Sequence, residues 1–429
     1  MSNTQWSFDT LQIHAGQTPD SDTGSRALPI YQTTSYVFNN AEQAAGRFAL
    51  TDAGPIYTRL TNPTTAVVEE RVAALEGGAA AIFVSSGQSA EFYAVLNIAS
   101  QGDEIVSSPS LYGGTYNLFK TTLPTFGITT NWVENPDDID SWRAAITEKT
   151  KLLYAESIPN PKGDIPDFEA LADLAHEFGI PLIIDNTIGT PYNVRPLEYG
   201  ADIVVESATK FLGGHGTSVA GVIVEKGDFN WKNGKFPLFS QPDPSYNGLV
   251  FGDLGPGAFV TRIRATLLRD TGAAVSPFNA FLIEQGIETL SLRVQRHLDN
   301  AKAVAEYLNG HDAVESVTYS GLVSSPYYER AQKYAPKGAG SVFSFNLKGG
   351  RKAGEAFVDA LQLFSNLANI GDVRSLVIHP ASTTHSQLTD EELLSSGISG
   401  GTIRLSIGIE DINDILADIE KGLAAAQLA

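Results

Sequence analysis

The sequence predicts an α/β protein with a mostly parallel β-sheet covered by helices on both faces, followed by a smaller α+β domain. From residue 63 onward, near-continuous apolar runs of strand length alternate with segments of helical periodicity. Strands that are apolar on both sides are typical of parallel sheets buried between two helical layers. Because 429 residues exceed the size of one ordinary core, we expect a large domain over residues 63–290 and a C-terminal domain over residues 291–429.

The alternation is preceded by an irregular segment, residues 1–62, which contains many Thr, Asn, Gly and Pro residues. We interpret it as an N-terminal arm that is either disordered or packed against another surface. The first helix is expected over residues 63–75, with Pro63 in its first turn and a glycine pair after its end. A buried strand over residues 81–84 follows, and then a helix to about residue 99.

Six more apolar runs of strand length lie further along, with helical segments between most of them. The clearest of these helical segments covers residues 168–178. In parallel sheets of this kind, ligands bind outside the carboxyl ends of the strands, so polar residues at those ends are candidates for a site. The expected strands are residues 104–106, 128–133, 152–155, 182–184, 203–205 and 219–224.

An insertion at residues 225–257 interrupts the pattern with glycine, proline and aromatic residues, and we expect an ordered loop or a packed surface insertion. A long helical stretch over residues 277–309, either two helices or one helix kinked at Gly286, links the domains. The C-terminal domain is expected to contain strands at residues 314–319, 341–347 and 403–407 and helices at residues 353–361 and 411–425.

The composition excludes several classes of function. A formal net charge of −20 disfavours nucleic acids and anionic membrane surfaces as partners. The chain has no cysteine, so disulfides, thiolate nucleophiles and cysteine-based metal sites are excluded, and its seven histidines show no metal-binding spacing. Since we find neither a signal-peptide pattern nor an apolar stretch of membrane-spanning length, we expect a cytoplasmic protein without a metal.

Lys210 and Asp185 carry the strongest chemical signal. Lys210 closes the run Ser207-Ala208-Thr209-Lys210 after one apolar strand, and Asp185 ends the strand before it. A lysine and an aspartate at the ends of adjacent strands suit pyridoxal phosphate, because the lysine holds the aldehyde as a Schiff base and the carboxylate keeps the pyridine nitrogen protonated. Taken singly, either residue is more often a solvated loop charge or a turn residue.

The phosphate of this cofactor needs backbone N–H groups at a helix start, together with hydroxyl groups and positive charge. The turn Ser86-Gly87-Gln88 lies between an expected strand and an expected helix, and its glycine allows a close approach to the backbone. Ser207 and Thr209 can add hydroxyl groups. A serine at a helix start is also a common cap, so the turn alone is a weak signal.

Short segments spread over nearly the whole chain form a further pattern. They are Tyr57-Thr58-Arg59, Asn62-Pro63-Thr64, Ser86-Gly87-Gln88, Tyr112-Gly113-Gly114-Thr115, Asp185-Asn186-Thr187, Ser207-Ala208-Thr209-Lys210, Ser375-Leu376-Val377-Ile378-His379-Pro380, Thr384-His385 and Arg404-Leu405-Ser406. Together they resemble the Cys/Met-metabolism family of pyridoxal phosphate enzymes. This resemblance implies the fold-type I architecture, with a sheet of seven strands.

The resemblance also implies a role for each position. Lys210 would be the Schiff-base lysine and proton carrier, Asp185 the partner of the pyridinium, and Thr187 a neighbour of the ring. Tyr112 would stack on the ring face and assist proton exchange. The residues that would bind the phosphate end of the cofactor are Ser86, Gly87, Gln88, Ser207 and Thr209.

Two further groups of residues are implied in the same way. Tyr57 and Arg59 would reach the phosphate in a neighbouring subunit, so the resemblance implies a homotetramer built from dimers with shared active sites. Arg404, helped by Asn160 and Ser375, would hold the α-carboxylate of a small-molecule substrate. Plainer interpretations remain for two of them, since Asn160 could be a turn residue before proline and Arg404 could pair with Glu410 at the surface.

Within the family, the chain is most similar to the O-acetylhomoserine sulfhydrylases. The similarity lies in residues 375–387, in the insertion at residues 225–257, and in Gln88, where lyases and γ-synthases often carry methionine. Gly114 stands where methionine γ-lyases usually have cysteine. The implied reaction belongs to methionine biosynthesis. It converts O-acetylhomoserine and sulfide, or a thiol such as methanethiol, into homocysteine or methionine, with release of acetate.

Several alternatives stay open at this point. The substrate could be the succinyl ester, and the acceptor could be sulfide or methanethiol. The protein could instead catalyse γ-elimination as cystathionine and methionine γ-lyases do, or bind a ligand without catalysis. The N-terminal arm is compatible with either a dimer or a tetramer.

Overall fold

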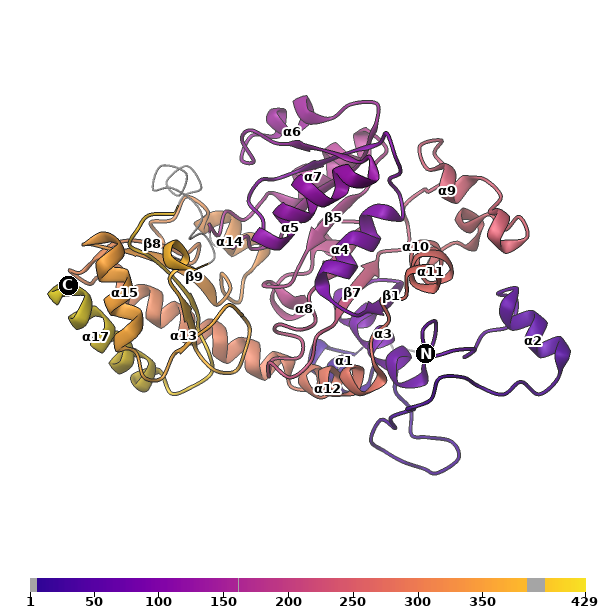
Figure 1. The fold of residues 1–429 in the computed structure, drawn as a ribbon, viewed down its shortest axis with the longest axis horizontal. Helices are drawn as coiled ribbons and strands as arrows, with labels where there is room; N and C mark the ends of the chain where they lie inside the picture. The colour runs from indigo at the N-terminus through magenta and orange to yellow at the C-terminus, as the bar shows by residue number, and fades with distance from the viewer. Residues whose placement is uncertain (1–5, 161, 384–397) are drawn as a thin grey trace.

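The computed structural model describes residues 6–160, 162–383 and 398–429. These residues form an N-terminal arm, a large α/β domain and a smaller α+β domain (Figure 1). The far end of the arm and the C-terminal helix lie at opposite ends of the long axis of the molecule. The large domain between them contains the sheet that the sequence predicts.

Within the described residues, the sheet of the large domain has seven strands in the order β1-β7-β6-β5-β4-β2-β3. They are β1 (Ala80–Val84), β2 (Glu104–Ser107), β3 (Thr129–Trp132), β4 (Thr150–Glu156), β5 (Leu182–Asp185), β6 (Ile203–Glu206) and β7 (Gly221–Glu225). All seven correspond to predicted strands. The sheet is mostly parallel as expected, but β7 runs antiparallel to both β1 and β6, which hydrophobic periodicity alone does not reveal.

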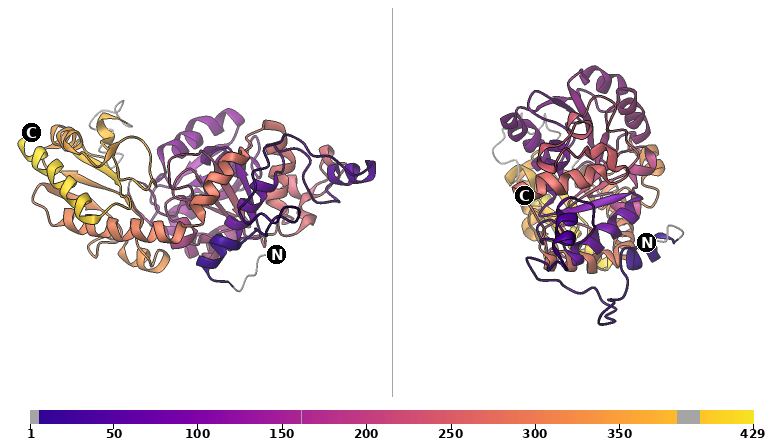
Figure 2. Two further views of the ribbon diagram at one scale, coloured as in Figure 1. Left: turned by 90° about the horizontal axis from the view of Figure 1, so that it is seen from below. Right: turned by 90° about the vertical axis from the view of Figure 1, so that its right-hand side faces the viewer.

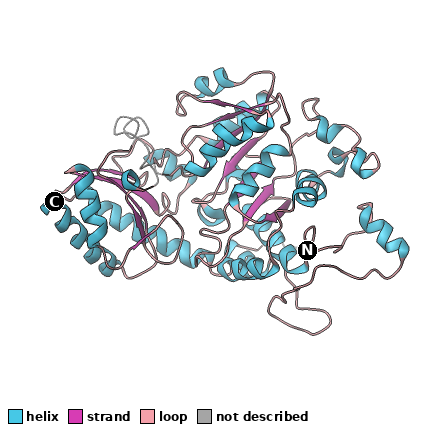
Figure 3. Cartoon of the chain, viewed as in Figure 1, coloured by secondary structure: helices cyan, strands magenta, loops and turns pink. Residues whose placement is uncertain are grey.

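Helices flank these strands (Figure 3). Those of the large domain are α3 (Pro63–Glu76), α4 (Gly87–Leu96), α5 (Gly113–Asn117), α6 (Ile139–Ala145), α7 (Phe168–Glu177), α8 (Thr190–Asn193), α10 (Ala258–Ile263) and α11 (Arg269–Thr271). Side-chain caps start the longer ones: Asn62 Oδ1 accepts the Thr64 N–H at 2.9 Å in α3, and Asp167 caps α7. Such caps satisfy N–H groups that have no partner inside the helix.

The arm contains two helices that its irregular composition does not predict. α1 (Phe8–His14) is docked on the body of the protein, where Gln12 Nε2 donates to Ser291 Oγ at 2.9 Å and the Ser291 N–H donates back to Gln12 Oε1 at 3.0 Å. The chain then leaves the body, and α2 (Ala41–Phe48) lies near the far end of the arm (Figure 1). Short helices of this kind depend on tertiary contacts more than on periodicity.

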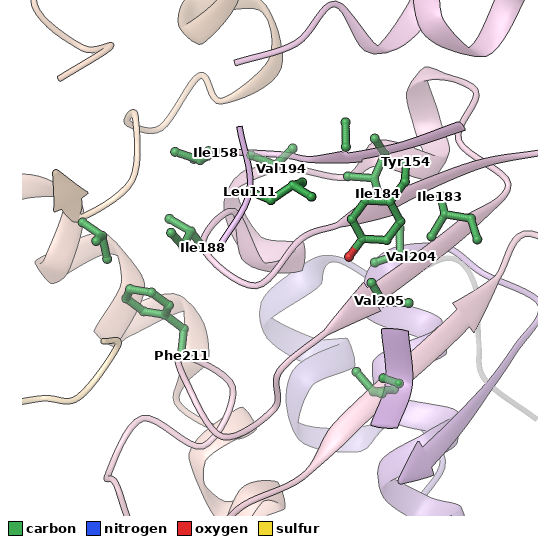
Figure 4. Packing of buried hydrophobic residues seen from close by; sticks show 14 of the residues in the cluster. Leu111, Tyr154, Ile158, Ile183, Ile184, Ile188, Val194, Val204, Val205 and Phe211 are labelled. Atoms are coloured by element: carbon green, nitrogen blue, oxygen red, sulfur yellow. The ribbon is translucent and has the colours of Figure 1, made fainter. Parts of the chain in front are cut away.

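The core beneath the strand ends is densely filled with aliphatic and aromatic side chains. Figure 4 shows the ring of Tyr154 on β4 beside Ile184 on β5, with Val204 of β6 next to them. All three are fully buried. Burial raises the pKa of the Tyr154 phenol well above its ordinary value. Because close-packed interiors allow little movement, the residues that follow these strands are held in fixed positions.

The insertion at residues 225–257 is ordered and includes the short helix α9 (Pro237–Ser240). Trp231 stacks on Phe239 with ring centroids 4.7 Å apart, and on Phe259 of α10 at 5.2 Å. Phe239 and Phe259 are fully buried. This aromatic stack fixes the insertion to the large domain.

Replacing Trp231 with alanine should destabilise the protein by about 3–5 kcal/mol, because it removes a buried aromatic side chain and leaves a cavity. The measurement is the Tm at matched protein and cofactor concentrations, since a chain with two domains need not unfold in one step. Trp6, which is 42% exposed, provides the matched control, and W6A should shift the Tm far less. Equal shifts for the two variants would contradict this account of the stack.

The connection between the domains consists of two helices, α12 (Pro277–Ile287) and α13 (Leu290–Asn309), which settles the alternative left open by the sequence. α13 runs from the large domain into the C-terminal domain (Figure 2). Among the described residues, the second sheet has the order β10-β11-β12-β9-β8. Its elements are β8 (Val314–Thr318), α14 (Tyr328–Tyr334), β9 (Val342–Leu347), α15 (Gly350–Ala360), β10 (Ser365–Asn366), β11 (Leu376–Ile378), β12 (Thr402–Ser406) and α17 (Ile412–Leu428).

Three elements of the C-terminal domain, α14, β10 and β11, were not expected from the sequence. β11 has only three residues, and the sheet that surrounds it supplies the pairing that a short strand needs. In the described part of the chain, no helix combines the length and the apolar character that crossing a membrane requires.

Candidate active site

A cavity of about 280 Å³ lies at the carboxyl ends of β4, β5 and β6 and is closed on one side by the C-terminal domain. This is the position at which open α/β sheets bind their ligands. Eleven of the fourteen predicted site residues line it, and Tyr57, Arg59 and Ser375 do not. The lining consists of Ser86, Gly87, Gln88, Glu91, Tyr112, Glu156, Ile158, Asn160, Asp185, Thr187, Ile188, Ser207, Thr209, Lys210, Val219, Ala368, Asn369, Ile370 and Arg404.

Asp185 is placed by the register of the sheet. It is the last residue of β5, opposite Glu156 on β4 and Val205 on β6. Its Oδ1 accepts the Thr187 N–H at 2.8 Å, which orients the carboxyl group. Burial raises the pKa of Asp185. Among the described residues, no Lys, Arg or His forms an ion pair with it, so a cationic group bound in the cavity would compensate its charge.

Lys210 follows β6 on a tight turn in which its N–H donates to the Ser207 carbonyl at 3.1 Å. Thr209 ties this turn to the strand beside it, because its Oγ1 donates to the Ala220 carbonyl at 3.1 Å and accepts the Ala220 N–H at 3.0 Å. Lys210 Nζ extends into the cavity and donates to Asn369 Oδ1 at 2.5 Å.

The two cationic residues of the cavity both have a lowered pKa. Burial, and secondarily the charge of Arg404, lowers the pKa of Lys210. Burial also lowers the pKa of Arg404. A lysine with a lowered pKa releases its proton more readily, which suits a group that must exchange protons with a substrate.

The start of α4 can receive a phosphate group. Ser86 Oγ accepts the Ser89 N–H at 3.1 Å, whereas the first N–H groups of the helix, at Gly87 and Gln88, have no acceptor within it. A Cβ on Gly87 would lie 2.7 Å from the Cβ of Ser207, so only glycine fits there. N–H groups at a helix start with hydroxyl groups beside them are suited to bind a phosphate.

The side chain of Gln88 is engaged elsewhere. Its Nε2 donates to Glu91 Oε2 at 2.9 Å, so the amide side chain faces Glu91 and only the backbone N–H remains for a phosphate. Thr187 is also partly engaged, since its Oγ1 accepts the Ser207 N–H at 2.8 Å. It therefore joins the Asp185 loop to the Lys210 turn.

Arg404 and Asn160 face the cavity, but Ser375 does not. Arg404 on β12 donates to the Asn369 carbonyl at 3.2 Å, and Asn160 Oδ1 is buried without a hydrogen-bond partner. Ser375 is fully buried, and its Oγ donates to Glu410 Oε2 at 2.9 Å and accepts the Gly408 N–H at 2.9 Å. The Ser375 side chain therefore does not line the cavity in this structure, and its role in holding the substrate stays a prediction.

The alternative pairing of Arg404 with Glu410 is not found in the described part of the chain. The Glu410 carboxylate instead accepts both the N–H and the hydroxyl of Ser375. The other motif residues of this region, Thr384 and His385, and the end of the run at residues 375–387 lie outside the described residues.

Tyr112 stands at the mouth of the cavity. It precedes α5, is 53% exposed, and its N–H donates to the buried carboxylate of Glu156 at 2.5 Å. Gly114 leaves room for the Tyr112 ring, since a Cβ on residue 114 would lie 2.4 Å from that ring. Tyr57 and Arg59 lie together on the arm, with the guanidinium 5.3 Å from the ring centroid. Both are exposed, and neither lines this chain's own cavity.

Sequence reasoning missed three polar residues of the cavity wall: Asn369, Glu91 and Glu156. Glu156 directly follows the predicted strand at residues 152–155, and this position after a strand was a usable signal. Asn369 lies on a loop of the C-terminal domain, and Glu91 lies one turn into α4, so neither stands at a strand end. Within the described residues, we find no group of three or more His, Cys, Asp or Glu side chains placed to hold a metal ion.

This sheet, with a lysine, an aspartate and a helix start around a cavity at its strand ends, defines the protein as a fold-type I pyridoxal phosphate enzyme. The chain belongs to the family described as Cys/Met metabolism PLP-dependent enzymes, whose model matches residues 9–424. The buried carboxyl of Asp185, which has no ion-pair partner among the described residues, fits the pyridine ring of that cofactor. The turn at Gly87 fits its phosphate, and the Lys210 amine in the cavity fits its aldehyde.

Named relatives match the chain over nearly its full length. The O-acetyl-L-homoserine sulfhydrylase of Corynebacterium glutamicum is 54% identical over 426 residues, which cover 98% of each chain. The homocysteine synthase of Schizosaccharomyces pombe is 52% identical over 423 residues, again 98% of each. A solved structure from Campylobacter jejuni, described as an O-acetylhomoserine (thiol)-lyase with a pyridoxyl-lysine phosphate, superposes with a TM-score of 0.94 at 42% identity and covers 98% of this chain and 100% of that one.

Proposed function

We propose that the protein catalyses the γ-substitution of O-acetyl-L-homoserine by sulfide, which yields L-homocysteine and acetate for methionine biosynthesis. The bond between Cγ and the ester oxygen breaks, and a bond between Cγ and sulfur forms. The observation that carries the proposal is the cavity that joins Lys210, Asp185 and Arg404. The full-length similarity to sulfhydrylases supports the choice of reaction.

When bound, pyridoxal phosphate supplies a conjugated ring that accepts the electron pair left on the substrate Cα. Lys210 Nζ removes the Cα proton and returns it to the neighbouring carbons, for which its lowered pKa is favourable. Asp185 would hold the ring nitrogen of the cofactor and keep it positively charged. Ser207, Thr209 and the N–H groups at the start of α4 hold the phosphate, and Tyr112 covers the open side of the cavity.

Arg404 binds the α-carboxylate of the substrate, because its fork of N–H donors matches a carboxylate and it lines the same cavity as Lys210. The buried Oδ1 of Asn160, which has no partner, is available to the protonated groups of the substrate. Both assignments depend on side chains that point into the same cavity.

R404A should lower kcat/KM about 10- to 100-fold, mostly through a higher KM, because the α-carboxylate loses a charge-assisted hydrogen bond. R404K should recover only part of this loss, because lysine keeps the charge without the fork. Arg143 pairs with Glu177 at the surface and provides the control R143A. An R404A variant with unchanged KM would exclude Arg404 from substrate binding.

The function is tested with the purified holoenzyme and a panel of substrates, with products identified by mass spectrometry. Homocysteine should form faster from O-acetylhomoserine and sulfide than from the succinyl ester and sulfide, and faster than methionine forms from O-acetylhomoserine and methanethiol. Faster release of a keto acid from methionine or cystathionine would overturn the proposal in favour of a γ-lyase.

We also propose a cytoplasmic homotetramer built from dimers, in which Tyr57 and Arg59 of the arm complete the cavity of a neighbouring subunit. The exposed position of both residues on an arm that extends from the body supports this arrangement. Light scattering of the holoenzyme tests the tetramer.

A further inference from the structure

The helix that connects the two domains, α13, carries a row of buried polar side chains on one face. They are Arg293, His297 and Asn300, whose spacing along the sequence places them on the same side of an α-helix. Their exposed fractions are 6%, 0% and 3%, in that order. Because buried polar groups are costly unless they are hydrogen-bonded, the partners of these three show what this face of the helix holds.

Arg293 binds the loop that follows Lys210. Its Nη1 donates to the Phe211 carbonyl at 2.9 Å, and its Nη2 donates to the Leu212 carbonyl at 3.2 Å. The same Nη2 donates to the Gly286 carbonyl near the end of α12 at 2.7 Å. Within the described residues the guanidinium has no carboxylate as an ion-pair partner, so these carbonyls compensate its buried charge.

The loop is shaped to close on this guanidinium. Gly214 has a φ of +72°, and a Cβ there would collide with the Arg293 side chain. A Cβ on Gly286 would collide with the Gly213 carbonyl, so α12 also approaches the loop closely. The contact of Arg293 with the loop is therefore built from both sides.

His297 and Asn300 bind the segment that follows β12, the strand that carries Arg404. His297 Nδ1 donates to the Ile407 carbonyl at 2.6 Å. Asn300 Nδ2 donates to the Gly408 carbonyl at 3.0 Å and to the carbonyl two residues further on at 2.9 Å. These contacts fix the end of β12 to α13.

The His297 ring also lies against the other segment. It packs edge-to-face on the ring of Phe211, with centroids 5.3 Å apart. Phe211 directly follows Lys210, and Ile407 comes three residues after Arg404. One face of a single helix therefore holds the main chain beside both cationic residues of the cavity, one from each domain.

We propose that this face of α13 is a positioning element that sets the spacing between Lys210 and Arg404, so that the substrate Cα–H bond meets the amine while the α-carboxylate is held. Arg293 fixes the lysine side and Asn300 the arginine side. Inside the cavity Asn369 adds a second link, because its side chain accepts the lysine and its carbonyl accepts the arginine. Proton transfer needs its groups within about 0.5 Å of the productive geometry. The proposal rests on the roles of Lys210 and Arg404 in the function proposed above.

Steady-state kinetics of the holoenzyme separates the two ends of the element. R293M removes every donor from the lysine side, so it should lower kcat about 10- to 100-fold and leave the KM for O-acetylhomoserine within about threefold of wild type. N300L should do the reverse, with KM about 5- to 10-fold higher and kcat within about threefold. The same pattern of changes in kcat and KM for both variants would overturn the proposal.

A conservative variant and a matched control accompany these two. R293K keeps the charge without the fork of donors, so it should recover part of the lost kcat. If R293M gives no folded holoenzyme, R293K takes its place, with the same direction of change and a smaller amplitude. Arg296 lies on the same helix but is exposed, so R296M should keep the kcat and KM of the wild type.

Hydrogen exchange of the holoenzyme, followed by mass spectrometry of its peptides, provides a measurement without turnover. R293M should speed exchange in residues 207–216 at least about fivefold and leave residues 402–411 near the wild-type rate. N300L should show the opposite pattern. Equal acceleration of both segments by either variant would indicate general loosening of the fold and would overturn the proposal.

The failure of this inference differs from a failure of the proposed function. If the wild type forms no homocysteine, the proposed function fails, and hydrogen exchange still decides whether α13 holds the two segments separately. If the wild type forms homocysteine while R293M and N300L match its kcat and KM, only the inference about α13 fails.

Discussion

Replacing Lys210 with alanine should lower kcat/KM for O-acetylhomoserine at least about 10³-fold, because the variant loses both the covalent attachment of the cofactor and the group that moves the Cα proton. The Tm should change little, since Lys210 is half-buried and its amine makes a single hydrogen bond, to Asn369. Borohydride treatment followed by peptide mass spectrometry should locate a pyridoxyl adduct on Lys210 in the wild type and none in K210A.

Lys226 offers a matched control at the end of the neighbouring strand β7. It pairs with Asp228 at 3.1 Å outside the cavity, so K226A should keep the activity and the borohydride adduct of the wild type. A K210A enzyme within about tenfold of wild-type kcat/KM would show that Lys210 is not the proton carrier. An adduct on another lysine would show that the cofactor is attached elsewhere.

D185N should lower kcat about 10²- to 10³-fold, because it removes a preorganised charge opposite the ring while keeping the size of the side chain. Cofactor affinity should also fall. Because burial raises the pKa of Asp185, acidification protonates it earlier than an exposed aspartate. Cofactor affinity in the wild type should therefore decrease as the pH falls through that pKa, whereas the affinity of D185N should not follow this titration.

Cofactor titration at several pH values, with kcat measured on the same preparations, checks both parts of this prediction. D253N is the matched control, since Asp253 pairs with Lys232 at the exposed surface of the insertion. A variant D185N with the pH dependence of the wild type would contradict the assignment of that titration to Asp185.

The local parts of the site could be predicted because their geometry depends on neighbouring residues. Asp185 and Lys210 each end an apolar strand, and parallel strands that are adjacent in a sheet bring their carboxyl ends to one edge. The turn at Gly87 is likewise a local feature, a strand followed by a serine cap and a helix. The family resemblance then added Arg404 from the other domain.

Contacts between distant segments could not be predicted in this way. Ser375 belongs to a motif that suggested substrate binding, yet its hydroxyl lies against Glu410 because the second sheet turns it away from the cavity. Asn369 meets Lys210 across 159 positions of sequence, and no periodicity or motif marks such a pair.

Hydrophobic periodicity in the sequence by itself determined the fold class and the strand sequence of the large domain. The residues at the strand ends indicated the cofactor, and the resemblance of short segments along the chain indicated the family. Only the tertiary structure decided that β7 is antiparallel, that α1 docks on the body, and that Glu91 lines the same cavity as Asp185. The physical reason is that strand direction, docking and the protonation of buried groups depend on neighbours distant in the chain, which become neighbours only after folding.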